Sequence, residues 1–376
     1  MASKAFIYSP EIEQYGYPPS CPFNTTRAGK ARGILASMGL LSGDGKREEP
    51  LRAATEEEML AFHTDRYLDA LRRAPTEYEL EMMHMGLGTA DCPVFHGMYE
   101  YAAMACGASL VGAELILSGE ADIAFNPSGG YHHAFRDMAA GFCYINDAVL
   151  ACMKLANAHK RVAYLDIDVH HGDGVQAAFY DRDDVMTISI HESGRALFPG
   201  TGFPDEIGTA AGEGYSVNLP MPPGTYDEAW LAAFDETVMP LLGAYDPDAI
   251  VIEIGMDTLR GDPLAHLSLT NNAPAAALAQ VRDMGKPILA VGGGGYNVDN
   301  AARGWALAWS VLCGEDGPDE MDVGLGGVML ESSEWQGGLR DRMLVPDSTQ
   351  LAEVAPAVRD TVEAVKANVF PIHGLE

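Results

Sequence analysis

Residues 164–174, YLDIDVHHGDG, contain three aspartates and two histidines within eleven positions. Such residues are poor strand formers, and charged side chains are rarely buried without a partner. In an extended chain, residues two apart face the same side, so Asp166, Asp168 and His170 are expected to point one way. Two carboxylates and an imidazole on one face suit a divalent cation such as Zn²⁺, Fe²⁺, Co²⁺ or Mn²⁺. The alternative is that Asp166 and Asp168 only cap a strand end.

A second segment supplies a further acidic candidate for this cation. Asp257 ends the apolar run DAIVIEIGMD, residues 248–257. One strand rarely supplies every ligand of a metal ion, and a bound cation offsets the cost of burying carboxylates. We therefore predict Asp168, His170 and Asp257 as ligands, with an open position left for water and substrate.

Two adjacent histidines, His132 and His133, follow Ser-Gly-Gly in the segment PSGGYHHAF. Glycines in such a loop allow close approach of the backbone. We predict that both histidines act on the water beside the metal. Each needs a carboxylate to set its tautomer and tune its pKa, and Asp166 and Asp173 remain for this role. The alternative is a structural pair of histidines.

The glycine run GGGGYN, residues 292–297, follows a predicted strand and precedes a predicted helix. This is the context of a dinucleotide-binding turn, but neither register matches GxGxxG and no GK[ST] follows. We expect these glycines to let the backbone crowd a cavity while Tyr296 projects inward. A phenol in that position can donate a hydrogen bond to a developing oxyanion, and a packed core tyrosine is the alternative.

The candidate residues lie where apolar runs of the chain end. The predicted strands are 4–10, 121–127, 161–170, 184–192, 248–257 and 286–295, and the predicted helices are 56–73, 96–118, 145–159, 227–243, 272–285 and 299–313. This alternation is typical of a doubly wound, mostly parallel α/β sheet with helices on both faces, which places its chemistry at the carboxyl ends of the strands. Five predicted strands end in polar clusters, for which five unrelated turns are the alternative. We expect a single domain over residues 1–376.

Composition limits the classes of partner. The 376 residues are 47% apolar and carry a net charge of −30. This charge argues against nucleic acid as a partner, because phosphates would be repelled. It is compatible with a cationic substrate, with a salty habitat or simply with a solvated acidic surface.

The six cysteines form no CxxC pair. The first residues contain no apolar stretch of signal-peptide length, and no later stretch reaches membrane length without a charge or a glycine. These features predict reduced thiols in a cytoplasmic protein that does not enter a membrane.

The motifs resemble those of the arginase–deacetylase superfamily, specifically class I-like histone deacetylases and their bacterial relatives, including acetoin-utilisation deacetylases. The similar segments span roughly residues 60–305 and are FHTDRYLDAL, ADCPVF, PSGGYHHAF, GFCYINDAV, YLDIDVHHGDGVQ, FPGTG, MDTLRGDPLAHLSLT and VGGGGYN. The DxDxHHGDG pattern differs from the DxHxD pattern that serves two manganese ions in the arginase branch. The resemblance implies the arginase–deacetylase fold and a zinc-dependent hydrolase, with Fe²⁺ or Co²⁺ as other possible metals, that removes acetyl or other short acyl groups from lysine.

The resemblance also assigns roles to the catalytic candidates. Asp168, His170 and Asp257 are similar to the family's metal ligands. His133 resembles the general base and acid, and His132 resembles its electrostatic partner; Asp166 and Asp173 pair with these histidines. Tyr296 resembles the tyrosine that polarises the scissile carbonyl.

Five further residues resemble the family's substrate channel. Gly141, Phe142 and Phe198 match the walls of the narrow acyl-lysine channel. Leu264 matches its rim, and Asp91 matches the rim aspartate that grips the substrate backbone. Leu264 is not the glutamate that marks polyamine-selective members, which favours acyl-lysine over an acetylpolyamine.

The family also binds structural K⁺ at two sites, partly through backbone carbonyls. The first would use Asp166, Asp168, His170, Ser189 and Ile190, and the second Phe179, Arg182, Val185 and Tyr215.

The sequence departs from the family pattern in two places. Arg27 resembles the arginine of the internal acetate-exit region, but Cys21-Pro22 stands where the family has His-Pro. Met256 precedes Asp257 where smaller residues are common, so the pocket floor is expected to differ. An acetylpolyamine or small-amide amidohydrolase, and an acyl-lysine binding protein with a decayed site, are the competing hypotheses. The oligomeric state is not predicted.

Overall fold

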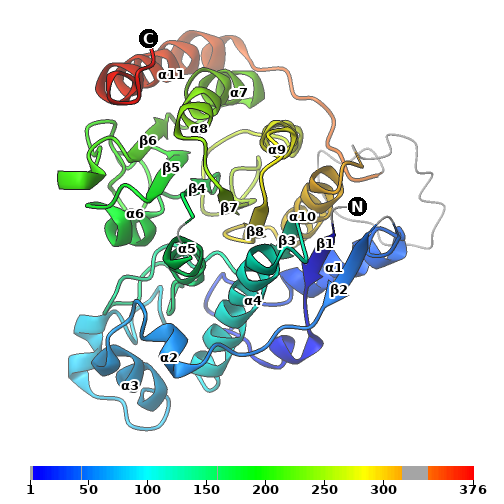
Figure 1. The fold of residues 1–376 in the computed structure, drawn as a ribbon, viewed down its shortest axis with the longest axis vertical. Helices are drawn as coiled ribbons and strands as arrows, with labels where there is room; N and C mark the ends of the chain where they lie inside the picture. Colours follow the sequence, from blue (N-terminus) through cyan, green and yellow to red (C-terminus); the bar gives the residue numbers. More distant parts are fainter. Residues whose placement is uncertain (1–2, 44, 159, 316–337) are drawn as a thin grey trace.

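Eight strands form one sheet in the computed structural model, which describes residues 3–43, 45–158, 160–315 and 338–376 (Figure 1). The strand order is β2-β1-β3-β8-β7-β4-β5-β6, and every neighbouring pair is parallel. The strands are β1 (Lys4–Ile7), β2 (Lys46–Glu49), β3 (Ile123–Asn126), β4 (Val162–Asp166), β5 (Val185–Glu192), β6 (Ser216–Met221), β7 (Ala249–Glu253) and β8 (Ile288–Val291). The predicted parallel α/β sheet is confirmed.

All six predicted strands form, but two further strands were not predicted from the sequence. The residues of β2, KREE, lack any apolar run, and β6 contains Pro220. Both strands lie at edges of the sheet, where a charged or proline-containing strand is tolerated because one side makes no ladder. The prediction of a strand over 161–170 was too long, since β4 ends at Asp166.

Helices lie in the segments that connect the strands and after the last strand. They are α1 (Arg27–Ser37), α2 (Glu56–Met59), α3 (Asp65–Arg73), α4 (Met98–Ser118), α5 (Asp147–Asn157), α6 (Asp173–Phe179), α7 (Asp227–Ala233), α8 (Met239–Tyr245), α9 (Asn272–Asp283), α10 (Val298–Leu312) and α11 (Ser348–Val369). The predicted helix 56–73 is two helices, because Thr64 caps a new start by accepting a hydrogen bond from the Tyr67 N–H. A π-helical stretch, Phe234–Val238, separates α7 from α8 within the predicted helix 227–243. Helices α1, α6 and α11 were not predicted.

Helices pack on both faces of the sheet (Figure 1). Residues of α1 and of α7 to α11 form one apolar cluster with alternate strand residues such as Leu165 and Ile252. Residues of α3 to α6 form the second cluster with the intervening residues, such as Tyr164 and Val251. This alternation follows from the two-residue period of a strand. It sends the side chains of Tyr164 and Asp166 toward the face covered by α4 and α5.

Helix α4 is long and apolar enough to cross a membrane by length and composition alone. However, 72% of its most apolar window is buried inside the fold, between the sheet and α5. This burial is typical of a core helix.

Candidate active site

The five strands whose ends carry polar clusters are contiguous in the middle of the sheet. They are β3, β8, β7, β4 and β5, in that spatial order. Because all are parallel, their carboxyl ends lie at one edge, and the loops that follow them meet there. The site therefore combines segments that are far apart in the sequence.

Asp168, His170 and Asp257 lie together at this edge. Nδ1 of His170 is 3.1 Å from Oδ1 of Asp168 and 3.1 Å from Oδ2 of Asp257. One potential ligand atom from each residue lies within 4.8 Å of the others, and all three residues are buried. Burial and the neighbouring Asp168 raise the pKa of Asp257 to about 7. Two buried carboxylates beside an imidazole fit a divalent cation, whose charge would offset the cost of burying them.

The sequence analysis predicted that strand alternation would bring these residues together. The structure shows that two turns do so instead. The chain leaves β4 after Asp166 and turns twice: the Asp168 N–H donates to Oδ1 of Asp166 (3.0 Å), and the His170 N–H donates to Oδ1 of Asp168 (2.9 Å). Aspartate side chains favour such turns because they bond to the backbone two residues on. The Val169 N–H donates to Oδ1 of Asp257 (3.0 Å), which joins the two segments.

The glycine run after β8 brings backbone against the same carboxylates. The Gly294 N–H donates to Oδ2 of Asp168 at 2.6 Å. A Cβ atom at this position would lie 1.9 Å from Oδ2 of Asp257, so no other residue fits without displacing that carboxylate. This is the crowding that the sequence GGGGYN predicted.

The structure brings each of the tandem histidines together with its predicted carboxylate. Nδ1 of His132 lies 2.8 Å from Oδ2 of Asp166, and Nδ1 of His133 lies 2.7 Å from Oδ1 of Asp173. The two Nε2 atoms are 3.0 Å apart, so the free edges of both rings face the same point.

The two histidines differ in their electrostatic surroundings. Burial opposes a charge on His132, but the carboxylates of Glu253 and Asp166 raise its pKa well above the usual value. Burial lowers the pKa of His133 well below the usual value, and the positive charge on His132 adds to this effect. His132 is therefore the histidine that holds the proton, and His133 is neutral and able to accept one.

Two residues that the sequence analysis missed hold the histidine loop in place. The buried Asp147, at the start of α5, accepts hydrogen bonds from the backbone N–H groups of Gly130 and Tyr131 and from Ser109. The Asn146 side chain donates to the carbonyls of His132 and Ala134. The segment GFCYINDAV was recognised only as part of a motif, and no periodicity signals this role.

Tyr296 follows the glycine run and reaches the metal-ligand cluster. Its ring centroid is 6.4 Å from that of His170 and 5.6 Å from that of Phe142. Burial and the carboxylates of Asp257 and Asp168 raise its pKa well above 10, so the hydroxyl keeps its proton. Asp262, which was also missed, accepts a hydrogen bond from the Tyr296 N–H at 2.7 Å.

Two aromatic rings pack against these groups. The Phe198 ring centroid is 4.9 Å from that of His133, and 45% of Phe198 is exposed. Phe142 packs on Tyr296, and its φ of 66° is unusual for a residue with a side chain. Gly141 lies against His133, since a Cβ there would be 2.4 Å from Cδ2 of that ring. Asp91 accepts a hydrogen bond from the Gly141 N–H at 2.9 Å.

Leu264 and Arg27, the remaining candidates, adjoin the segment that carries Tyr296. Leu264 is partly buried, and its N–H donates to Oδ1 of Asp262, the residue that also holds Tyr296. The buried Arg27 donates to the carbonyl of Gly295 at 2.9 Å and lies over the Phe23 and Trp305 rings.

The two sets of residues predicted for K⁺ lie at opposite ends of the strands: the first at the carboxyl ends and the second near the amino ends. Ser189 pairs with Asp166 in the β4–β5 register, and its hydroxyl contacts His191; Ile190 is buried in β5. The second set lies near the amino ends of β5 and β6. There the Arg182 N–H donates to the Phe179 carbonyl, and Tyr215 accepts from the Thr187 N–H. Each carbonyl retains a second lone pair, so neither contact excludes a cation.

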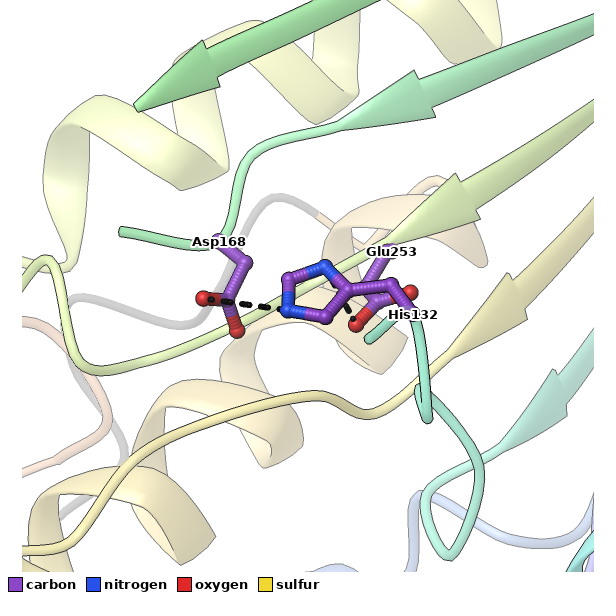
Figure 2. Close-up of side chains that lie close together, drawn as sticks. All are labelled: His132, Asp168 and Glu253. Carbon is purple, nitrogen blue, oxygen red and sulfur yellow. Dashed lines mark ion pairs between the residues drawn. The ribbon is translucent and has the colours of Figure 1, made fainter. Parts of the chain in front are cut away.

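Glu253 is the largest omission of the sequence analysis. Its side chain is fully buried at the end of β7, where it accepts a hydrogen bond from the Tyr164 hydroxyl. The only signal in the sequence is a single acidic residue within the apolar run AIVIEIG. With His132 and Asp168 it forms a second group of potential metal ligands, shown in Figure 2. His132 is less suited to bind a metal, because both of its ring nitrogens already face hydrogen-bond partners.

Comparisons with known proteins relate the chain to one family. Residues 21–312 match the histone deacetylase domain. The chain is 40% identical over 314 residues to histone deacetylase RPD3 of Saccharomyces cerevisiae, covering 82% of this chain and 71% of that protein. It is 41% identical over 329 residues to the acetoin utilization protein AcuC of Bacillus subtilis, covering 84% of each.

Solved structures show the same architecture. The crystal structure of a histone deacetylase homologue complexed with SAHA superposes with a TM-score of 0.85 at 31% identity, covering 97% of this chain and all of that one. The homologue from Aquifex aeolicus superposes with a TM-score of 0.82 at 30% identity, with the same coverage.

Proposed function

Because this chain belongs to the histone deacetylase family, we propose that it hydrolyses the amide bond of acetylated or other short-acylated lysine side chains in proteins or peptides, releasing acetate. The observation that carries the proposal is the meeting of Asp168, His170 and Asp257 with His133 and Tyr296 at one edge of the sheet. A metal-ligand set, a base and a hydroxyl donor are the groups that amide hydrolysis needs.

The proposed catalytic metal is Zn²⁺, with Fe²⁺ or Co²⁺ as the alternatives, held by Asp168, His170 and Asp257. Two carboxylate oxygens and one imidazole nitrogen leave a coordination position open, as in catalytic sites. When bound, such a cation supplies Lewis acidity toward water and toward the amide oxygen.

The histidine pair is proposed to move the protons. His133 accepts a proton from the attacking water at Nε2, while Asp173 holds its Nδ1–H, and it then returns the proton to the leaving lysine amine. His132, oriented by Asp166, contributes its positive charge beside the developing negative charge. Opposite pKa shifts on two neighbouring groups are the pattern expected of such a division of roles.

Tyr296 is proposed to stabilise the oxyanion. Its raised pKa keeps the hydroxyl protonated, and burial strengthens the hydrogen bond that it donates. Asp262 holds the backbone of Tyr296, so this donor is in place before the substrate arrives.

The substrate is proposed to enter between Phe142 and Phe198. Two aromatic rings and Gly141 favour the apolar methylenes of a neutral acyl-lysine and exclude water. Asp91 at the rim would accept hydrogen bonds from the substrate backbone. Leu264 offers no charge for a polyamine, which supports acyl-lysine as the substrate class.

Two further sites belong to the proposal. Arg27, beside Gly295, would attract the acetate product on its way out. Structural K⁺ would be held by the two residue sets described above, one adjoining the metal ligands and one near the amino ends of the strands.

We propose a cytoplasmic location and one catalytic domain over residues 1–376. The six cysteines are all unpaired, which supports a reducing compartment. A single sheet with cores on both faces supports one domain. The net charge of −30 supports basic protein substrates rather than nucleic acid as the partner.

The test is hydrolysis of an acetyl-lysine peptide by the purified protein loaded with Zn²⁺, Fe²⁺ or Co²⁺, in parallel with acetylated spermidine. We expect acetate release from the peptide and a roughly 10²–10⁴-fold loss of rate in His133→Ala. The exposed His84 provides the matched control, and His84→Ala should keep full activity. Turnover of acetylspermidine alone would replace the proposal with a polyamine amidohydrolase.

A further inference from the structure

Glu253 is a buried carboxylate that the reaction outlined above does not use. Its side chain is fully buried at the end of β7, and the strand register places it beside Asp166 of β4. Neighbouring residues of a parallel ladder face the same side of the sheet, so the two carboxylates lie together. Burying a second carboxylate there is costly unless it has a favourable partner.

Two groups face Glu253. The Tyr164 hydroxyl is 2.7 Å from its Oε2 and 2.8 Å from Oδ2 of Asp166, so it lies between the two carboxyl groups and donates its one hydrogen to either of them. The other oxygen, Oε1, has no hydrogen bond among the described residues and lies 3.2 Å from Nδ1 of His132 (Figure 2). The ring nitrogen of His132 therefore faces two carboxylates, although its best-aligned hydrogen bond is to Asp166.

This arrangement fixes which way the His132 ring faces. With Nδ1 against the carboxylates, Nε2 lies 3.0 Å from Nε2 of His133. Rotating the ring by half a turn would place a C–H group against two carboxylate oxygens and remove the contact with His133. Asp166 alone opposes this rotation with one hydrogen bond, and Glu253 adds a second oxygen that favours the same orientation.

We propose that Glu253 is a positioning residue for His132: together with Asp166 and Tyr164 it forms a buried two-carboxylate support that holds the ring with Nε2 directed at His133. This inference rests on the proposed function. Glu253 touches neither the substrate channel nor the reacting atoms, and it acts only through His132.

The test compares Glu253→Gln and Glu253→Leu with the wild-type enzyme. The amide of glutamine keeps an oxygen at the position of Oε1, whereas leucine removes it. We expect Glu253→Leu to lower kcat about 10–100-fold, the range for partners that orient an active-site group, and Glu253→Gln to recover most of that loss. KM and bound metal should stay at wild-type values in both variants.

A second measurement does not depend on activity. In protein labelled with ¹⁵N at histidine, the Nδ1 resonance of His132, assigned by its absence in His132→Ala, reports which ring nitrogen faces the carboxylates. We expect this resonance to move in Glu253→Leu and, by a smaller amount, in Tyr164→Phe. The Nδ1 resonance of His133, which bonds to Asp173, should move less.

These readouts separate the two proposals. A wild-type protein without deacetylase activity, but with a His132 resonance that responds to Glu253→Leu, would refute the function and keep the positioning role. Unchanged kcat and an unchanged His132 resonance in Glu253→Leu would overturn the positioning role. If Glu253→Leu does not fold, the same two measurements on Tyr164→Phe decide, and wild-type kcat and an unchanged His132 resonance in that variant would overturn the positioning role.

Discussion

The carboxyl ends of the neighbouring strands β4 and β5 carry the same residue types and do different work. After β4, the buried His170 faces the carboxylates of Asp168 and Asp257, both 3.1 Å from its Nδ1. Burial opposes protonation of His170, but these two carboxylates raise its pKa to about 10. A cation bound between the three groups would replace that proton.

At the end of β5, His191 is just as buried and faces no carboxylate in the part of the chain that the structure describes. Its Nε2–H donates to the Gly202 carbonyl, and its Nδ1 accepts from the Ser189 hydroxyl. Burial lowers its pKa well below the usual value, so it stays neutral. Glu192, the next residue, turns away and binds the backbone and ring of His266.

The difference teaches that a histidine at a strand end becomes a candidate ligand only when carboxylates converge on it. The end of β4 carries the proposed metal ligands. The end of β5 adjoins the proposed substrate channel, because Gly202 belongs to the loop that carries Phe198, and His266 lies two residues after Leu264. Substitutions at the two strand ends should therefore affect different properties: metal binding and catalysis at β4, and peptide binding at β5.

The largest expected effect is at β4. Asp168→Asn removes one anionic ligand, so we expect loss of the bound metal and a fall in kcat/KM beyond the roughly 10–100-fold cost of losing an outer-shell partner. Elemental analysis and the acetyl-lysine assay measure both. The exposed Glu236→Gln is the control, and an Asp168→Asn enzyme with full metal and full activity would contradict the assignment.

Tyr296→Phe should keep the metal and lose rate. Removing one oxyanion donor costs roughly 10²–10³ in kcat, while the ring still packs on Phe142. The matched control is Tyr99→Phe, whose hydroxyl contacts Arg72 on the surface. A near-wild-type kcat in Tyr296→Phe would show that Tyr296 is only a core tyrosine.

At β5, His191→Leu should act through the channel and not through the metal. It leaves the Gly202 carbonyl and the Ser189 hydroxyl without their partner, which costs about 1–3 kcal/mol in the free energy of unfolding. We expect a several-fold higher KM for the peptide, with bound metal unchanged. Urea unfolding and peptide kinetics measure these effects. Loss of the bound metal in His191→Leu would contradict the distinction between the two strand ends.

The smallest effect on activity is expected at another buried histidine, His63, which lies away from the strand ends and affects only the pH dependence of stability. Burial lowers its pKa to about 4. A lowered histidine pKa means that the unfolded chain binds the proton more tightly, so stability is lost as the pH falls from about 6.5 toward 4, by up to about 3 kcal/mol. His63→Gln should show a shallower fall between pH 7 and 5 in urea unfolding. A slope equal to that of the wild type would exclude His63 as its source.

Much of the fold could be predicted because it depends on local patterns. Apolar runs marked the six central strands, whereas β2 is charged and β6 is interrupted by Asn218 and Pro220, patterns that an edge strand tolerates. In the site, Asp168, His170, Asp257, the tandem histidines and Tyr296 were all singled out. Asp147, Asp262 and Glu253 were missed, because each acts on backbone or side chains from another segment and a lone carboxylate has no periodic signal.

By itself, the sequence determined the class of sheet and the kinds of chemical group at its carboxyl edge, since both follow from residue type and spacing along a few neighbouring positions. Only the tertiary structure decided which carboxylate serves which histidine. Asp168 meets Asp257 and His132 meets Glu253 across strands that are distant in the chain, and the charges that converge on a buried imidazole set whether it binds a metal, holds a proton or remains neutral.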